Sequence, residues 1–288
     1  MTAARGATHT VEFDVVPVGP YRLPGGGRDG VLQRREGALV RAVEAEGETA
    51  VVRAWGAGGA VRFCAEAPTH DSAAAAIERM RFALGTDHDL RAFHRRFVRD
   101  PLVGPVIRRR PWLRPRRRPE PFEALAWAVC EQLIDSRRAS GIERSIVRRL
   151  GVLTACGAYR LPPTAARLAA AAPAELDACG LAPKRSIALR SAAREVASGR
   201  ADLREHESSW RRLLAIPDIG NWTIEMLAFE GQGRDDKIPA LDLAYVKLVG
   251  RLAHGGRRAT EEEVRAYFAP YEEYAALAGI YALGRRYL

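Results

Sequence analysis

Residues 213–252 read LLAIPDIGNWTIEMLAFEGQGRDDKIPALDLAYVKLVGRL, and this stretch decides the fold. A helix is expected to end at Ile216, because the next four residues, Pro217-Asp218-Ile219-Gly220, are typical of a tight turn. A second helix is expected to begin near Asn221. The stretch therefore predicts a helix-hairpin-helix at about residues 210–230.

The predicted hairpin has the features of a phosphate-binding turn. Gly220 has no side chain where the backbone must approach a ligand closely, and the exposed amides at the start of the second helix form a natural anion site. Such a hairpin grips a DNA backbone without reading its sequence. A purely structural connector between two helices has the same pattern, so the hairpin alone leaves both interpretations open.

Composition also favours a polyanionic partner. The chain has 288 residues, of which 47% are hydrophobic, so it can bury a substantial core and is expected to form two domains. Its formal net charge is +10 and its pI about 9.9, which makes nucleic acid the first candidate partner. Liberal use of arginine by a high-GC genome would explain the same charge, so the distribution of the basic residues has to decide.

Neither a membrane segment nor a cofactor is indicated. The opening residues MTAARGATHT lack an apolar signal core, and no apolar run is long enough to cross a bilayer, so a cytoplasmic location is expected. The four cysteines, Cys64, Cys130, Cys156 and Cys179, are widely scattered without zinc spacing or a four-cysteine iron-sulfur cluster. They are expected to be reduced and structural.

The first 88 residues predict a small α+β domain. Four short runs separated by Gly-rich or charged turns are expected to form an antiparallel sheet: Val11–Val18, Ala38–Val43, Thr49–Trp55 and Ala60–Ala65. Residues 71–84 then show an amphipathic helical pattern, capped by Asp71 or Ser72 and ended by Gly85, and this helix is expected to cover the sheet.

Residues 89–288 predict a mainly α-helical second domain. Nearly every segment there has the three-to-four residue period of a helix, broken by Gly or Pro. Phe122, Leu125, Val129 and Leu133 form one apolar stripe. Further helices are expected at residues 165–172, 174–179, 185–198, 210–216, 223–229, 243–252 and 261–268.

Basic residues concentrate where the two domains join. Residues 91–118 contain eleven arginines and one acid, Asp100, with RRRPWLRPRRR at the centre. Arginine suits phosphate because of its forked donors, so the stretch could attract DNA in a salt-dependent manner. A solvated linker kept extended by Pro111, Pro115 and Pro119 is the alternative interpretation.

The hairpin together with Asp242 in the sequence IPALDL resembles the helix-hairpin-helix, Gly/Pro-rich loop and aspartate signature of a large DNA glycosylase superfamily. Two further segments resemble the 3-methyladenine DNA glycosylase II family of alkylation repair: PFEALAWAVCEQLIDSRRAS at 121–140 and CGLAPKRSIALRSAA at 179–193. In that superfamily the position of Trp222 is lysine in enzymes that form a Schiff base and nick the strand, and aromatic in the alkylpurine enzymes.

This resemblance implies a monofunctional enzyme that flips an alkylated purine out of duplex DNA and hydrolyses its glycosidic bond in base excision repair. It assigns catalysis to Asp242, whose ionised carboxylate would stabilise the oxocarbenium-like sugar and orient or deprotonate water. Trp222 would offer an electron-rich face to the cationic base. Asp242 would also serve well as the N-cap of a helix starting at Leu243.

The resemblance also implies the rest of the site. It places four residues in the base pocket: Trp222, Met226, Leu243 and Tyr271. It makes Leu133 a wedge that fills the gap left by the flipped base, whereas the apolar stripe would make Leu133 part of the core. The DNA-binding positions are Leu133, Gln132, Pro217, Ile219, Gly220, Asn221, Thr223, Lys184 and Arg185. Lys184 and Arg185 could equally be the solvated start of a helix.

The remaining implications concern partners. The backbone carbonyls of Leu214, Ile216 and Ile219 match positions that can hold Na⁺ or K⁺ in the family; no other cofactor is expected. The expected partner is double-stranded DNA with damaged bases, bound by a monomer on the bacterial nucleoid, with no membrane association.

Several residues depart from the family pattern. Asp218, Glu131 and Asp135 would place acids near the DNA, which would weaken its binding, and Met226 and Leu243 replace aromatic residues while Tyr271 replaces a tryptophan.

Two other functions are therefore kept as alternatives. One is a helix-hairpin-helix protein that binds DNA or lesions without cutting the base out. The other is a glycosylase for deaminated or oxidised purines, because the sequence does not rank the possible lesions.

Overall fold

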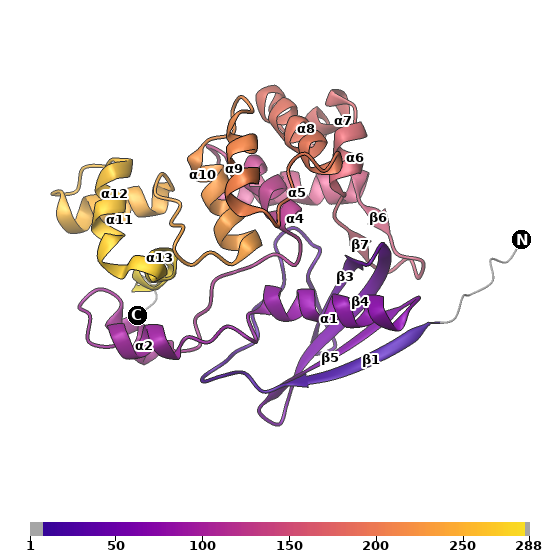
Figure 1. The fold of residues 1–288 in the computed structure, drawn as a ribbon, viewed down its shortest axis with the longest axis horizontal. Coiled ribbons are helices and arrows are strands. Elements are labelled where there is room, and N and C mark those ends of the chain that lie inside the picture. The colour runs from indigo at the N-terminus through magenta and orange to yellow at the C-terminus, as the bar shows by residue number, and fades with distance from the viewer. Residues whose placement is uncertain (1–7, 286–288) are drawn as a thin grey trace, which may run out of the picture.

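The computed structural model describes residues 8–285, and it begins with a five-stranded antiparallel sheet carrying one helix (Figure 1). The strand order is β1-β5-β4-β3-β2. Strand β1 ends at Val15, three residues before the predicted end, because Pro17 cannot donate to a ladder. The strands are β1 (His9–Val15), β2 (Gln33–Arg35), β3 (Ala38–Ala45), β4 (Glu48–Ala57) and β5 (Ala60–Ala67).

Two-residue turns join β2 to β3, β3 to β4 and β4 to β5. Each turn puts both of its residues at positive φ, as at Glu46 (51°) and Gly47 (76°). This backbone conformation matches the twist of the strands, and a glycine at the second position adopts it without a side-chain clash. The glycine in each turn therefore sets the register of the sheet.

Helix α1 (His70–Leu84) covers the sheet, as the sequence predicted. Its N-cap is Thr69, whose side chain accepts a hydrogen bond from the Ser72 amide, so the predicted cap at Asp71 or Ser72 was wrong by two or three residues. Gly85 ends the helix at φ 66°, as predicted. Buried Ile77 and Met80 pack with Phe63 in the core of this domain.

The rest of the described chain is mainly helical, which confirms the predicted α+β fold class. Its helices gather around two separate cores: one holds α4 to α10 and the other holds α2, α3 and α11 to α13. Figure 1 shows α11, α12 and α13 together, apart from the group of α4 to α9 that lies above the sheet. None of the helices in residues 8–285 is long and apolar enough to span a bilayer.

The elements of this part are α2 (Arg91–Phe97), α3 (Gly104–Arg109), α4 (Pro121–Glu131), α5 (Ser136–Leu150), β6 (Val152–Leu153), β7 (Arg160–Leu161), α6 (Ala165–Ala170), α7 (Pro173–Asp177), α8 (Pro183–Ala197), α9 (His206–Leu214), α10 (Asn221–Met226), the π-helical turn η1 (Leu227–Gly231), α11 (Leu243–Ala253), α12 (Glu261–Phe268), the 3₁₀ turn η2 (Ala269–Tyr274) and α13 (Ala275–Gly284).

Residues 91–118 are not the solvated, extended linker that was one interpretation of their composition. They include α2 and α3, and arginines at the end of the stretch contact both the first 30 residues of the chain and the loop after η1. Arg118 is buried and contacts Asp29 at 2.6 Å, while Arg117 contacts Asp235 at 3.0 Å. Arg114 donates to the carbonyl of Pro20 at 2.8 Å. Much of the basic character at this junction is therefore structural.

A buried acid cluster near the end of α4 makes the stability of the fold depend on pH. Burial raises the pKa of Glu131, and the neighbouring carboxylates of Glu230 and Glu143 raise it further. Burial likewise raises the pKa of Glu143, although Arg118 opposes the shift. The folded chain therefore holds protons that the unfolded chain has released above its ordinary carboxyl pKa of 4.5.

We expect the unfolding temperature to fall as the pH rises from the ordinary carboxyl range to about 8, the raised pKa of Glu131. Glu143→Gln keeps the shape of the side chain and cannot titrate, so it should flatten this dependence. The exposed Glu48→Gln is the control and should keep the wild-type profile. Thermal unfolding over that pH range would contradict the assignment if all three profiles coincide.

Candidate active site

The predicted helix-hairpin-helix is present. Helix α9 ends at Leu214, two residues earlier than predicted, and α10 begins at Asn221 as expected. The turn between them is closed by the Ile219 amide, which donates to the carbonyl of Ile216 at 3.1 Å. Asp218 takes φ 65°, a left-handed conformation that aspartate tolerates better than most residues.

Gly220 keeps the space at the start of α10 open because it has no side chain. Its backbone is extended (φ −111°, ψ −178°), a conformation open to any residue, so the turn itself does not demand glycine there. A Cβ added at Gly220 would meet no atom within 4 Å. The exposed position and the absent side chain leave the start of α10 open to an approaching phosphate.

Some predicted DNA contacts are instead parts of the scaffold. Gln132 donates from Nε2 to the Asp218 carbonyl and to Thr223 Oγ1, each at 2.9 Å. Thr223 is buried, so its side chain holds Gln132 and is not available to DNA; a contact from its backbone stays a prediction. Arg185 donates to the carbonyl of Cys130 at 2.7 Å and thus caps the end of α4, which neither sequence interpretation foresaw. These contacts fix the end of α4 against the hairpin.

Leu133 lies on the surface beside this junction. Its relative exposure is 104%, so it is not in the core, as the apolar stripe allowed. The stripe ends with Val129, because α4 stops at Glu131 and Leu133 takes φ 57°. A leucine held in a left-handed conformation costs folding energy, and its full exposure gains no burial energy that would offset this cost. The structure keeps Leu133 in this position despite the cost, which favours a role in binding over a role in stabilising the fold.

Asp242 and Trp222 meet between the two helical cores. Asp242 is the N-cap of α11, and its Oδ1 accepts from the Ala244 amide at 2.8 Å. Its Oδ2 accepts from the indole Nε1 of Trp222 on α10 at 3.3 Å. Because the cap and the indole hold both oxygens, the carboxylate is fixed in orientation. Trp222 is only half-buried and lies outside both cores.

Two of the other predicted pocket residues lie in segments adjoining this pair. Met226 is partly buried at the end of α10, and Leu243, next to Asp242, is 49% exposed. Tyr271 is different: its ring packs against Phe97 and Phe268 in a core, and its hydroxyl donates to Asp100 at 3.1 Å. With 6% of its surface exposed it packs as a core residue, which does not favour the pocket role predicted for it; that role stays a prediction.

The acids that depart from the family pattern have structural explanations. Asp135 is the N-cap of α5, where it accepts from the amides of Arg137 and Arg138, each at 3.0 Å, and these bonds lower its pKa. Glu131 is partly buried beside Glu143 and Glu230, and burial raises its pKa, which favours the neutral form; its effect on DNA binding stays a prediction. Asp218 remains exposed on the hairpin.

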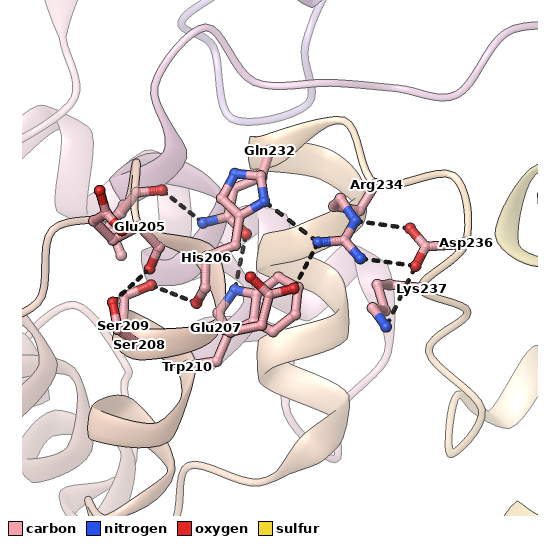
Figure 2. A network of polar contacts seen from close by, with 11 residues as sticks. Glu205, His206, Glu207, Ser208, Ser209, Trp210, Gln232, Arg234, Asp236 and Lys237 are labelled. Atoms are coloured by element: carbon pink, nitrogen blue, oxygen red, sulfur yellow. Dashed lines mark hydrogen bonds and ion pairs between the residues drawn. The ribbon is translucent and has the colours of Figure 1, made fainter. Parts of the chain in front are cut away.

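A clamp that the sequence did not reveal connects α9 to the segment leading to Asp242 (Figure 2). Trp210 donates from Nε1 to Gln232 at 2.9 Å, and the Arg234 guanidinium lies 5.2 Å from the centre of its ring. Arg234 also donates to Glu207 on α9 at 3.0 Å and pairs with Asp236 at 2.8 Å. The clamp fixes the hairpin helix relative to the loop that carries the carboxylate.

The cation proposed at the carbonyls of Leu214, Ile216 and Ile219 stays a prediction. The Ile216 carbonyl already accepts from Ile219, although a carbonyl oxygen can accept two bonds. Within residues 8–285, no group of three or more His, Cys, Asp or Glu side chains could hold a metal ion. Lys184 lies exposed near the start of α8. Pro217 and Asn221 are exposed at the hairpin, whereas the side chain of Ile219 is buried.

The fold and this site define a base excision DNA repair protein. The family model described as "HhH-GPD superfamily base excision DNA repair protein" matches residues 97–273, which is more than half of the chain. The chain belongs to this superfamily.

Within the superfamily, its relatives include DNA-3-methyladenine glycosylases. The DNA-3-methyladenine glycosylase of Bacillus subtilis (strain 168) is 25% identical over 202 residues, which are 68% of this chain and 67% of that protein. DNA-3-methyladenine glycosylase 1 of Schizosaccharomyces pombe is 31% identical over 131 residues, covering 43% of this chain and 54% of that protein, so about half of its length is matched.

The solved 3-methyladenine DNA glycosylase from Archaeoglobus fulgidus shares the fold over nearly the whole chain. The TM-score is 0.75 at 22% identity, and the match covers 88% of this chain and 87% of that chain. The small sheet domain is therefore part of the shared architecture.

Proposed function

We propose that this chain is a monofunctional DNA glycosylase that flips alkylated purines of the 3-methyladenine type out of duplex DNA and excises them by hydrolysis in base excision repair. The observation that carries the proposal is the Asp242–Trp222 pair, a carboxylate and an indole joined at 3.3 Å beside the helix-hairpin-helix. The names of its relatives support the substrate class.

The chemistry follows from the charge of the substrate. An alkylated purine is cationic, so its glycosidic bond is weak and the departing base needs little help from an acid. When that bond breaks, its electron pair leaves with the base and the sugar becomes oxocarbenium-like. The Asp242 carboxylate stabilises this positive charge and directs a water to C1′, and the proton of that water is released. The Trp222 ring offers its face to the cationic base.

The tryptophan at position 222 also predicts that the enzyme does not cleave the DNA strand. A lyase reaction needs an amine that attacks C1′ and forms a Schiff base. Trp222 stands where the strand-nicking enzymes of the superfamily carry lysine. The chain has three lysines, of which Lys237 pairs with Asp236 at 3.3 Å. The product is therefore an abasic site in an intact strand.

Leu133 is the wedge that holds the base out of the duplex. Its exposed side chain next to the hairpin would fill the gap in the base stack, and that contact compensates for the cost of its conformation. Leu133→Ala and Leu133→Gly should each lower excision from duplex DNA by roughly tenfold, because unstacking costs a few kcal/mol. Both should act like wild type on the same lesion in single-stranded DNA.

Stability separates the two variants. Glycine adopts φ 57° freely and alanine does not, so Leu133→Gly should be about 1 kcal/mol more stable than Leu133→Ala. Urea unfolding measures this difference. Equal loss of excision on duplex and single-stranded substrates would argue against a wedge.

Single-lesion duplexes test the substrate class. We expect base release from 3-methyladenine- or 7-methylguanine-containing DNA to exceed that from 8-oxoguanine- or hypoxanthine-containing DNA. Alkali should be needed before any strand breaks. Release of only oxidised or deaminated bases would favour a glycosylase for those bases. Tight binding without any base release would favour a non-catalytic lesion-binding protein.

A further inference from the structure

A cavity lies between the glycine loop, here residues 22–32, and the segment 110–118. Its volume is about 540 Å³, within the size range of small-molecule sites. Its walls come from residues 22–32, the end of α1, the segment 110–118 and Ile280 of α13. Neither Asp242 nor Trp222 is among its lining residues.

The lining is strongly cationic. Among the described residues that line the cavity, seven are arginines and the one acid is Asp29. The arginines are Arg22, Arg41, Arg110, Arg114, Arg116, Arg117 and Arg118. Carboxylates neutralise part of this charge, because Arg41, Arg117 and Arg118 each form ion pairs. Arg22 and Arg116 add further positive charge beside low-dielectric walls, and this charge favours an anion.

Buried donors in this lining are left without acceptors. The Nε atoms of Arg41, Arg114 and Arg117 are buried and have no hydrogen-bond partner within residues 8–285. Arg41 is only 5% exposed, and its terminal nitrogen is taken by Glu123. A buried donor without an acceptor costs free energy, but these Nε atoms have almost no accessible surface, so a ligand in the cavity does not reach them.

Two arginines and a glycine loop supply donors that a ligand in the cavity could use. Arg22 lies over the Trp112 ring, 4.1 Å from its centre. Arg116 lines the cavity as well, and its charge acts on Glu230, where it opposes the rise in the pKa of that carboxyl. In the glycine loop, the amides of Gly25 and Gly26 donate no hydrogen bond within the described residues, and a Cβ at Gly25 would meet nothing within 4 Å. Open amides beside arginines are the usual elements of a phosphate cradle.

We propose that this cavity binds a small, free polyanion of the phosphate class, and that the ligand fastens the sheet domain to the helical domain. This binding site is separate from base excision, because it uses none of the residues assigned to the excision reaction. A ligand that contacts both domains binds the folded chain alone, so it raises the unfolding temperature.

The test uses the full chain with tripolyphosphate as the probe, at constant ionic strength. Isothermal titration calorimetry should show saturable binding, and the unfolding temperature should rise with ligand. The double variant Arg22→Gln/Arg116→Gln should weaken binding by roughly tenfold or more, because charge-assisted bonds to phosphate are strong. It should leave the unfolding temperature without ligand and the excision of methylated bases unchanged. Arg99→Gln, an exposed arginine outside the cavity, is the matched control.

Three results would overturn the proposal. They are the absence of binding at millimolar tripolyphosphate, equal binding by the double variant and wild type, and displacement of tripolyphosphate by undamaged duplex DNA. Displacement by DNA would show that these arginines belong to a DNA-binding surface. This result does not depend on whether the chain excises bases.

Discussion

Asp242→Asn should lower the excision of methylated purines by on the order of 10²–10³-fold, because an amide cannot stabilise the positive sugar as a carboxylate does. The fold should be unaffected. Asparagine is as good an N-cap as aspartate, and its carbonyl oxygen can still accept a hydrogen bond from the Ala244 amide. Its NH2 group cannot accept from the Trp222 indole, so that single bond is lost. DNA binding should therefore be kept while the rate of the chemical step falls, which single-turnover measurements resolve.

Asp135→Asn is the matched control for this substitution. Asp135 is also an N-cap aspartate, on α5 beside Leu133, and the change removes one negative charge in the same way. Excision by Asp135→Asn should stay within a few-fold of wild type. If Asp242→Asn keeps wild-type excision, Asp242 is only a helix cap and the catalytic assignment fails.

Arg118→Met should cost about 3–5 kcal/mol of stability, the largest effect expected away from the active site. Arg118 is 7% exposed and contacts Asp29 at 2.6 Å, Glu123 at 3.3 Å and Glu230 at 3.6 Å. Burial alone would lower its pKa, but these carboxylates raise it, so the guanidinium stays charged. Removing it leaves the buried Asp29 without its ion-pair partner and takes a counter-charge away from Glu123 and Glu230.

Urea unfolding followed by circular dichroism measures this loss. Arg62→Met is the control, because it breaks a two-point contact with Asp14 in which both side chains are more than 40% exposed. Because water and salt screen this exposed pair, its loss should change the free energy of unfolding far less than the loss of Arg118. A loss for Arg118→Met no larger than for Arg62→Met would show that the buried cluster does not hold the domains together.

Local signals predicted most of the fold. Glycines at turns gave the strands β3 to β5 and the end of α1, and the Pro217–Gly220 turn gave the helix-hairpin-helix. The interior of residues 91–118 was not predicted, because its arginines obscure the apolar pattern of Phe93, Phe97 and Val106. Such arginines pack their stems against the core and find carboxylates that are distant in sequence. The division at residue 88 stays a proposal, since Val31 packs in a helical core.

The site was predicted where a residue's role depends on its immediate neighbours. Asp242 follows a Gly/Pro-rich loop and caps a helix, and both facts can be read from the sequence. The core packing of Tyr271 against Phe97 was not predicted, because it joins segments far apart in the chain. For the same reason the clamp of Trp210, Gln232 and Arg234 had no local signal.

Release of free base from randomly methylated duplex DNA, with strand integrity followed before and after alkali, is the most direct measurement. The proposed function predicts that wild-type protein releases methylpurines and leaves strands intact until alkali cleaves them at abasic sites, and that Asp242→Asn does neither. DNA binding without release of any methylpurine, or strand breaks that appear before alkali, would contradict a monofunctional alkylpurine glycosylase.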